Sequence, residues 1–135
     1  MAERLRFEKL EVRRKALAFA IKIYGVTKGF PRSESFGLTA QMRRAGVSVA
    51  ANIAEGASRA SPADKARFPE IAYGSLCEVT TMLQIAESQG FITTETLEQV
   101  YAAAMEVCRL LSGYRRSMTA RAEACRKEPA HSHKP

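Results

Sequence analysis

Residues 38–58 read LTAQMRRAGVSVAANIAEGAS, and this stretch decides how the chain folds. Apolar or small residues recur along it at spacings of three and four: Leu38, Met42, Ala45, Val49, Ile53 and Gly56. Such spacing places side chains on one face of an α-helix, and an apolar face packs against a core. The stretch therefore predicts a helix whose apolar face is buried against other helices.

The remaining sides of this helix carry few of the charged side chains that are typical of a solvated surface. A polar stripe beside the apolar face consists of Gln41, Arg44, Ser48, Asn52, Glu55 and Arg59. The third side is small or apolar apart from one arginine, with Arg43, Val47, Ala50, Ala51, Ala54 and Ala57. Because a helix that is apolar or small on most sides is covered on most sides, we expect a second copy of the chain to pack there. The residues of this predicted oligomer interface are Val47, Ala50, Ala51 and Ala54.

Three further helices are predicted around this one. Residues 8–28 form the first, which ends at a glycine and a proline, and its predicted inward face consists of Leu10, Leu17, Ile21 and Tyr24, widened by Ala16, Ala20 and Ile23. The next helix starts at Ser61, Pro62 and Asp64, which suit a helix N-terminus, and it stops at Gly90.

The last predicted helix is capped by Thr93 or Thr94 and frays near Ala124. No stretch alternates with period two, and short connections favour antiparallel neighbours. The sequence therefore predicts an all-α fold, an antiparallel up-and-down four-helix bundle. Pro69 lies inside the third helix, where it removes a backbone hydrogen bond at a cost on the order of 3 kcal/mol. We expect a kink at Pro69, or a first turn that belongs to the preceding loop.

A length of 135 residues suits one domain, which we place at residues 1–125, with residues 126–135 as a disordered basic tail. No apolar run approaches the roughly 18 residues of a membrane span, and the N-terminus lacks the apolar stretch of a signal peptide, so we expect a cytoplasmic protein. The spacing of Cys77, Cys108 and Cys125 predicts neither disulfides nor a metal site, and we expect no cofactor. Cys77 and Cys108 are interpreted as small packing residues.

Two segments carry a resemblance to a known family. Residues 37–45 read GLTAQMRRA, residues 47–56 read VSVAANIAEG, and Gly74-Ser75-Leu76 is followed by Glu78. With flanking matches over residues 7–92, the sequence resembles the bacterial four-helix-bundle proteins called 23S rRNA-intervening sequence proteins. The chain departs from the family pattern at Arg13, where an aromatic residue is common, and at Pro69.

This resemblance implies an antiparallel bundle that assembles as a homopentamer, with no known catalysis for most members. Relatives of the family include the accessory variability proteins of diversity-generating retroelements. Those proteins form pentameric barrels and bind nucleic acid and a reverse transcriptase. The resemblance therefore implies that RNA, DNA or a protein such as a reverse transcriptase is a partner of this chain.

The polar stripe of residues 38–58 is interpreted as structural. Glu55 and Arg59 are spaced as an ion pair within one helix, and Arg44 can reach Ser48 or Glu78. Buried polar groups must be satisfied, and a network that fixes two helices in register does so without a substrate. Its predicted members are Arg44, Ser48, Asn52, Glu55, Arg59, Ser75 and Glu78. Because the only histidines, His131 and His133, lie in the tail, the sequence does not predict an enzyme.

Basic residues are the better functional candidates, because the net charge of +7 is concentrated in the two end segments of the chain. Residues 1–30 carry +5 and residues 115–135 carry +4. An antiparallel bundle brings these segments to one end, where they could bind a phosphate backbone. The candidate residues are Arg4, Arg6, Lys9, Arg13, Arg14, Lys15, Arg115, Arg116, Arg121, Arg126 and Lys127.

We expect no stacking aromatic side chains in this basic patch, and therefore recognition of shape or backbone and not of bases. The leading hypothesis is a non-catalytic homo-oligomer that binds RNA or DNA as an accessory factor. The alternative is a structural or adaptor oligomer that holds a protein partner, with the charge serving solubility.

Overall fold

The computed structural model describes residues 10–127 and is all-α, as predicted. This part of the chain contains four α-helices, one short 3₁₀ turn (η2) and no strand. The elements are α1 (Glu11–Thr27), η2 (Arg32–Glu34), α2 (Leu38–Ala57), α3 (Pro62–Ser88) and α4 (Thr94–Arg126). Across these described residues, none of the helices combines the length and apolar character that a membrane span requires.

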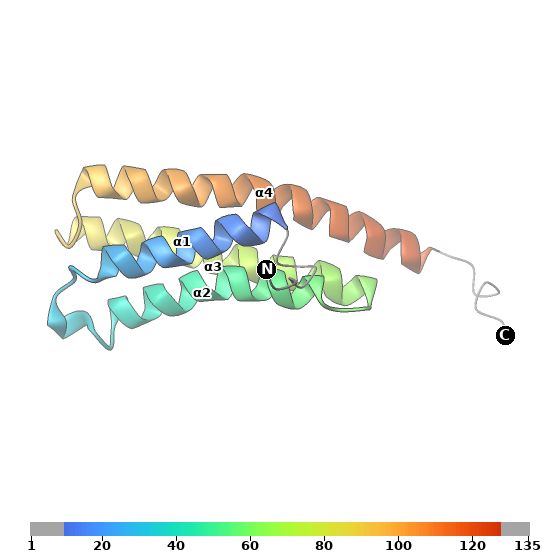
Figure 1. Ribbon diagram of the computed structural model, residues 1–135, viewed down its shortest axis with the longest axis horizontal. Coiled ribbons are helices and arrows are strands. Elements are labelled where there is room, and N and C mark those ends of the chain that lie inside the picture. The colour runs from blue at the N-terminus through green and yellow to red at the C-terminus, as the bar shows by residue number, and fades with distance from the viewer. Residues whose placement is uncertain (1–9, 128–135) are drawn as a thin grey trace, which may run out of the picture.

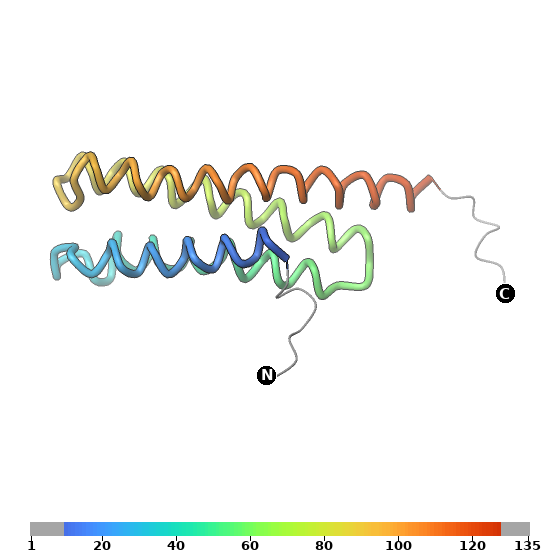
Figure 2. The backbone as a smooth tube through the Cα atoms, turned by 45° about the horizontal axis from the view of Figure 1, so that its top comes forward, coloured from blue at the N-terminus to red at the C-terminus, as the bar shows by residue number. Residues whose placement is uncertain are grey.

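Consecutive helices run in opposite directions along the long axis of the molecule (Figures 1 and 2). Helix α1 packs against α2 and α4, and α3 packs against the same two helices. The C-terminal end of α4 projects beyond the other three helices in both views. One end of the molecule therefore offers a helical surface that is only partly covered by neighbouring helices.

Side chains and glycine mark the helix ends where the sequence predicted them. The Ser61 hydroxyl accepts a hydrogen bond from the backbone N–H of Asp64 at 3.3 Å, with Pro62 as the first helical residue. Thr93 caps α4 in the same way, through the backbone N–H of Thr96 at 3.1 Å. Helix α3 is closed by Gly90, whose φ of 77° is readily adopted only by glycine. These three boundaries are confirmed. The sequence could predict them because each depends on contacts within a few residues.

The predicted apolar face of α2 is confirmed. Met42, Val49 and Ile53 are fully buried, and Gly46 also faces the core, against Ile23 of α1. A Cβ added at Gly46 would lie 3.6 Å from the Ile23 Cβ, which is ordinary van der Waals contact. Helix α2 therefore packs between α1 and α3.

The predicted inward face of α1 is wrong for three of its four residues. Leu17, Ile21 and Tyr24 are exposed, Ile21 to 64%. The predicted widening residues Ala16, Ala20 and Ile23 are buried, which confirms that part of the prediction, and Val12, Phe19 and Thr27 complete the side of α1 that meets the core. Apolar residues cover two adjacent sides of this helix, so helical period alone did not select the side that α2 and α4 would cover.

Helix α3 continues through Pro69, so the alternative in which its first turn belongs to the loop is wrong. Pro69 is buried and faces α2 at Gly56, where an added Cβ would lie 3.3 Å from the proline Cδ and 2.8 Å from the Phe68 Cβ. Gly74 does not share this role, because an added Cβ there would meet nothing within 4 Å. Gly56 is therefore the glycine that permits close approach of α2 and α3.

Candidate functional site

Some of the predicted nucleic-acid-binding residues lie within the described part of the chain. They are found at the start of α1 and in the C-terminal part of α4. Arg4, Arg6 and Lys9 lie outside the described residues. The exposed members that have no carboxylate at ion-pair distance within residues 10–127 are Arg14, Arg116, Arg121, Arg126 and Lys127. Arg13 is half-buried. We call these five exposed residues the basic end.

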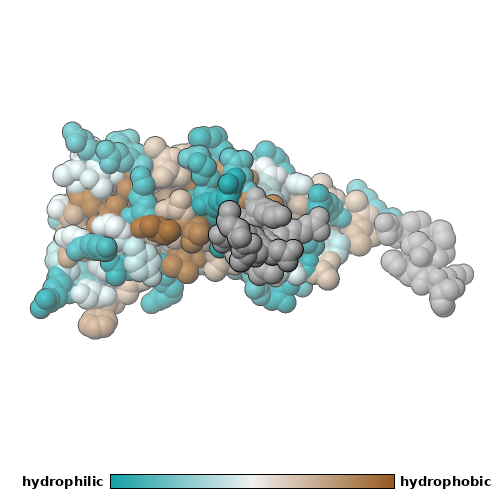
Figure 3. All heavy atoms as spheres, in the orientation of Figure 1, coloured by the Kyte–Doolittle hydropathy of each residue, from teal (hydrophilic) through white to brown (hydrophobic). Residues whose placement is uncertain are grey.

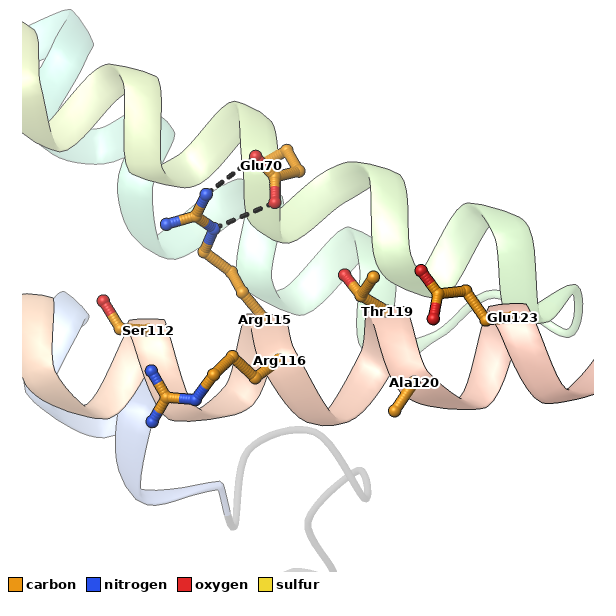
Figure 4. Close-up of a pocket in the computed structure, with 7 residues that line it drawn as sticks. All are labelled: Glu70, Ser112, Arg115, Arg116, Thr119, Ala120 and Glu123. Carbon is orange, nitrogen blue, oxygen red and sulfur yellow. Dashed lines mark hydrogen bonds and ion pairs between the residues drawn. The ribbon is translucent and has the colours of Figure 1, made fainter.

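Arg115 is a predicted candidate whose guanidinium already has a partner. Its Nε donates to Glu70 Oε1 at 3.0 Å and its Nη2 donates to Glu70 Oε2 at 2.9 Å, and its Cζ lies 4.0 Å from the centroid of the Tyr73 ring. The hydrogen bond to Glu70 raises the pKa of Arg115 above its ordinary value. Figure 4 shows this arginine reaching from α4 to α3, whereas Arg116 points away from Glu70. Arg115 therefore joins two helices.

Lys15 is also paired, because its Nζ lies 3.0 Å from Glu106 Oε1 on α4. Both side chains are 44% exposed, so this ion pair contributes little to stability. It shows, however, that the first turns of α1 lie beside α4 at the level of Glu106. Helix α4 continues for about 30 Å from Glu106 to Arg126, so Arg126 and Lys127 lie beyond the start of α1 and apart from Arg14 (Figure 1).

A groove at this end brings two further residues to the cations. Lys65 of α3 and Tyr114 of α4 line it together with Arg121. Lys65 was not among the predicted candidates, because nothing local in the sequence connects the start of α3 with the end of α4. The expectation that no aromatic side chain accompanies the cations does not hold at Arg121, since Tyr114 borders the same groove.

The predicted polar network is partly connected. Ser48 Oγ of α2 lies 2.8 Å from Ser75 Oγ of α3, and Asn52 Nδ2 donates to Ser48 Oγ at 2.9 Å and to the Ser48 carbonyl at 2.8 Å. Just beyond the end of α2, Arg59 forms an ion pair with Glu55 of that helix. The hydroxyl and amide groups of this cluster therefore satisfy one another and hold α2 and α3 together.

Two predicted members of the network stand apart. Arg44 and Glu78 line a shallow pocket with Ser48 and Ser75, but both are exposed, and neither makes a hydrogen bond or ion pair to the part of the chain that is described. Arg44 therefore makes neither of its expected contacts.

Thiols and carboxylates do not assemble into a metal site within residues 10–127, where no group of three or more potential ligands converges. Cys77 and Cys125 are exposed and Cys108 is half-buried. The interpretation of Cys77 as a packing residue is wrong, because it faces outward from α3.

An exposed apolar surface follows α1 and α2. Val47 is 44% exposed and Ala51 is also exposed, whereas Ala50 and Ala54 of the predicted interface are half-buried. The α1 residues that do not enter the core, Leu17, Ile21 and Tyr24, add to this surface. Figure 3 shows hydrophobic residues gathered where α1 and α2 lie side by side. We call these five exposed residues of α1 and α2 the apolar face.

Comparison with known proteins assigns the chain to a family. Residues 8–113 match the family described as 23S rRNA-intervening sequence protein. A crystal structure from Bacteroides thetaiotaomicron, of a protein with unknown function from the S23 ribosomal protein family, is 28% identical in sequence. The match covers 78% of this chain and 95% of that one, with a TM-score of 0.72. No curated protein matches the sequence. The chain belongs to the family of 23S rRNA-intervening sequence proteins.

Proposed function

We propose that this protein is a non-catalytic, self-associating four-helix bundle that binds the phosphate backbone of RNA or DNA through its basic end, as an accessory factor. One observation carries the proposal. The side chains of the basic end have no carboxylate at ion-pair distance within residues 10–127, whereas Arg115 and Lys15 are each paired with a glutamate. Cations without carboxylate partners remain available to replace the counterions of a phosphate backbone. A net charge of +7 favours encounter with a polyanion.

The apolar face supports self-association. Leu17, Ile21, Tyr24 and Val47 expose large apolar side chains on neighbouring helices, and a contiguous apolar patch of this kind marks an interaction surface. We expect a homopentamer, the assembly that the family resemblance implies. A closed ring repeats the basic end around its axis, so several weak phosphate contacts act together.

The absence of catalysis is part of the proposal. Ser48, Asn52 and Ser75 bond to one another, and Glu55 is paired with Arg59. Groups that are engaged in this way are poorly placed to transfer protons to a substrate. The polar cluster is therefore assigned to holding α2 and α3 in register.

A protein-binding adaptor is the second candidate, and the opposite end of the molecule favours it. Phe36 is 99% exposed in the connection between α1 and α2. Close by in the fold, Leu38, Ile85 and Phe91 line a hollow with polar residues at its edge. A fully exposed phenyl ring beside an apolar hollow suits a protein partner, such as the reverse transcriptase that the resemblance implies.

Binding of a generic RNA to the full chain separates the two functions. We expect a fluorescently labelled RNA to bind at about 50 mM salt and to lose at least about tenfold in affinity at about 200 mM, because phosphate contacts release counterions. A variant with Arg126→Gln and Lys127→Gln should bind more weakly, whereas Lys28→Gln with Arg32→Gln, at the opposite end, should bind normally. Failure of the unchanged protein to bind at low salt would remove the nucleic-acid function and leave the adaptor.

Self-association is tested separately by the mass in solution. Val47→Glu places a carboxylate in the apolar face and should dissociate the oligomer while the helical circular-dichroism signal persists. Ala102→Glu, at an exposed position of α4, is the matched control and should leave the mass unchanged. An unaltered mass for Val47→Glu by light scattering would rule out this interface.

A further inference from the structure

A groove that shares Arg121 with the basic end combines cationic, hydroxyl and apolar side chains from separate helices. Lys65 of α3 and Arg121 of α4 supply the charge, Tyr114 and Ser117 supply hydroxyls, and Leu10 and Met118 supply apolar surface. The cavity has a volume of about 410 Å³, within the range of pockets that hold small ligands. None of the described residues that line it is acidic.

The two cations of the groove differ in their bonding to the rest of the protein. Lys65 Nζ donates to the backbone carbonyl of Ala57 at 3.3 Å, in the last turn of α2, which positions the ammonium group at the wall of the groove. An ammonium group has three N–H donors, so two remain for a ligand. Arg121 is exposed and makes no ion pair to a carboxylate within residues 10–127. Together they place positive charge on two helices that face one opening.

Tyr114 is a neutral hydrogen-bond donor with a ring at the same opening. Burial raises the pKa of its phenol above the ordinary value, and the charge of Arg121 partly opposes this effect. The phenol therefore stays protonated at neutral pH. Its hydroxyl makes no hydrogen bond to any described residue. The side chain can thus offer both a ring for contact with a base and an O–H for an oxygen acceptor.

A neighbouring pocket shows why this groove suits an anion. That pocket, of about 360 Å³, is also lined by α3 and α4, but Glu70 and Glu123 stand beside Arg115 and Arg116 in it (Figure 4). Its carboxylates would repel a phosphate group, and Arg115 is already bonded to Glu70. Of these two sites, only the groove is lined by cations and by no carboxylate among its described residues.

We propose that the groove binds one nucleotide of a single-stranded RNA or DNA, with its phosphate between Lys65 and Arg121 and its base against Tyr114. The apolar residues Leu10 and Met118 would contact the sugar or the base edge. A base in a duplex is stacked and paired and cannot reach the tyrosine, so the groove selects single strands. This inference rests on the proposed nucleic-acid function and adds the form of nucleic acid and the residues that recognise it.

The experiment measures affinity of the full chain for a fluorescein-labelled oligouridylate of about 12 nucleotides, against a duplex RNA of the same length. We expect Tyr114→Leu to weaken single-strand binding by about tenfold, because a stacking contact is lost, and to leave duplex binding unchanged. Tyr114→Phe keeps the ring and should stay within about twofold of the unchanged protein. Tyr101→Leu, a half-buried tyrosine of the same helix, is the matched control.

The phosphate position is tested by the salt dependence. Lys65→Met and Arg121→Gln should each reduce the slope of log affinity against log salt by about 0.7, the value for one phosphate contact on a single strand. Arg32→Gln, at the far end of the molecule, should leave this slope unchanged. Equal single-strand affinities for the groove variants and the controls would overturn the groove, while RNA binding by the unchanged protein would still support the proposed function.

A smaller probe tests the groove without the other four residues of the basic end. Uridine 5′-monophosphate should shift the amide resonances of Lys65 and Tyr114 in the unchanged protein, and these shifts should disappear in Arg121→Gln. Shifts spread evenly over the surface would overturn the groove. If the unchanged protein shows these monophosphate shifts but does not bind RNA, the proposed function is overturned and the groove is not.

Discussion

The interface between α2 and α3 and the C-terminal end of α4 use polar and charged residues in opposite ways. At the interface, Ser48, Asn52 and Ser75 bond to one another, and Gly56 allows the helix backbones to approach closely. At the end of α4, Arg126 and Lys127 have no ion-pair partner within the described range 10–127. The difference teaches that polar residues in this protein contribute to stability where they are paired, and are available for ligands where they are not.

The largest loss of stability is expected at the closest contact between α2 and α3. Gly56→Ala places a Cβ 2.8 Å from the Phe68 Cβ, so the helices must separate, and we expect a loss of about 1–3 kcal/mol. Gly74→Ala is the matched control, because that helical glycine has open space, and it should stabilise by about 0.5–1 kcal/mol. Urea denaturation measures both, and equal effects at the two glycines would contradict the assigned approach.

Removal of the bridging hydroxyl should have the next largest effect. Ser48→Ala removes the hydroxyl that bonds to both Ser75 and Asn52, while Asn52 keeps its bond to the Ser48 backbone carbonyl, and we expect a loss of about 1 kcal/mol in the free energy of unfolding. The double variant with Ser75→Ala should lose less than the sum of the two single variants, because the residues share one bond. Simple additivity in a double-mutant cycle would show that the two hydroxyls act independently.

Within α4, neighbouring arginines should separate stability from binding. Arg115→Ala breaks the paired hydrogen bonds to Glu70 and the contact with Tyr73, so we expect a loss of up to about 1 kcal/mol. Arg116→Ala should change stability by less than about 0.5 kcal/mol, because this exposed side chain makes no ion pair within the described part of α4. Thermal denaturation and RNA binding should rank these two variants in opposite order.

The smallest expected effect is a pH dependence at Tyr114. Its pKa is raised in the folded state, so the fold favours the neutral phenol, and this contribution is complete below the ordinary value of 10.0. It is lost as the pH rises through the higher pKa of the folded state. The stability of the unchanged protein relative to Tyr114→Phe should therefore fall above about pH 10. A constant difference between the two across that range would contradict burial of the phenol.

Local chemistry allowed the helix boundaries to be predicted, whereas packing between helices was only partly accessible. Ser61, Pro62 and Thr93 mark helix starts through contacts within a few residues, so the sequence was sufficient there. The exposure of Leu17 and Ile21 depends on which side of α1 meets α2, and helical period does not determine this. The continuation of α3 through Pro69 likewise depends on the fit against Gly56.

Charge predicted the candidate site in outline and not in detail. The concentration of Arg and Lys near both ends was visible in the sequence. The sequence did not show which of these cations are paired, because the pairs join distant positions. Arg115 and Glu70, for example, are 45 residues apart. Lys65 and Tyr114 belong to the groove because α2, α3 and α4 meet there, and no motif in the sequence connects them.

Helix α4 runs without interruption for 33 residues, a length of about 50 Å. It begins after the Thr93 cap and ends at Arg126, so the helix holds its last cations at a fixed distance from the far end of the molecule. If copies associate as proposed, the last cations of each copy would be carried on a rigid helix and not on an extensible loop. The position of these cations relative to the bundle would then stay the same in every copy.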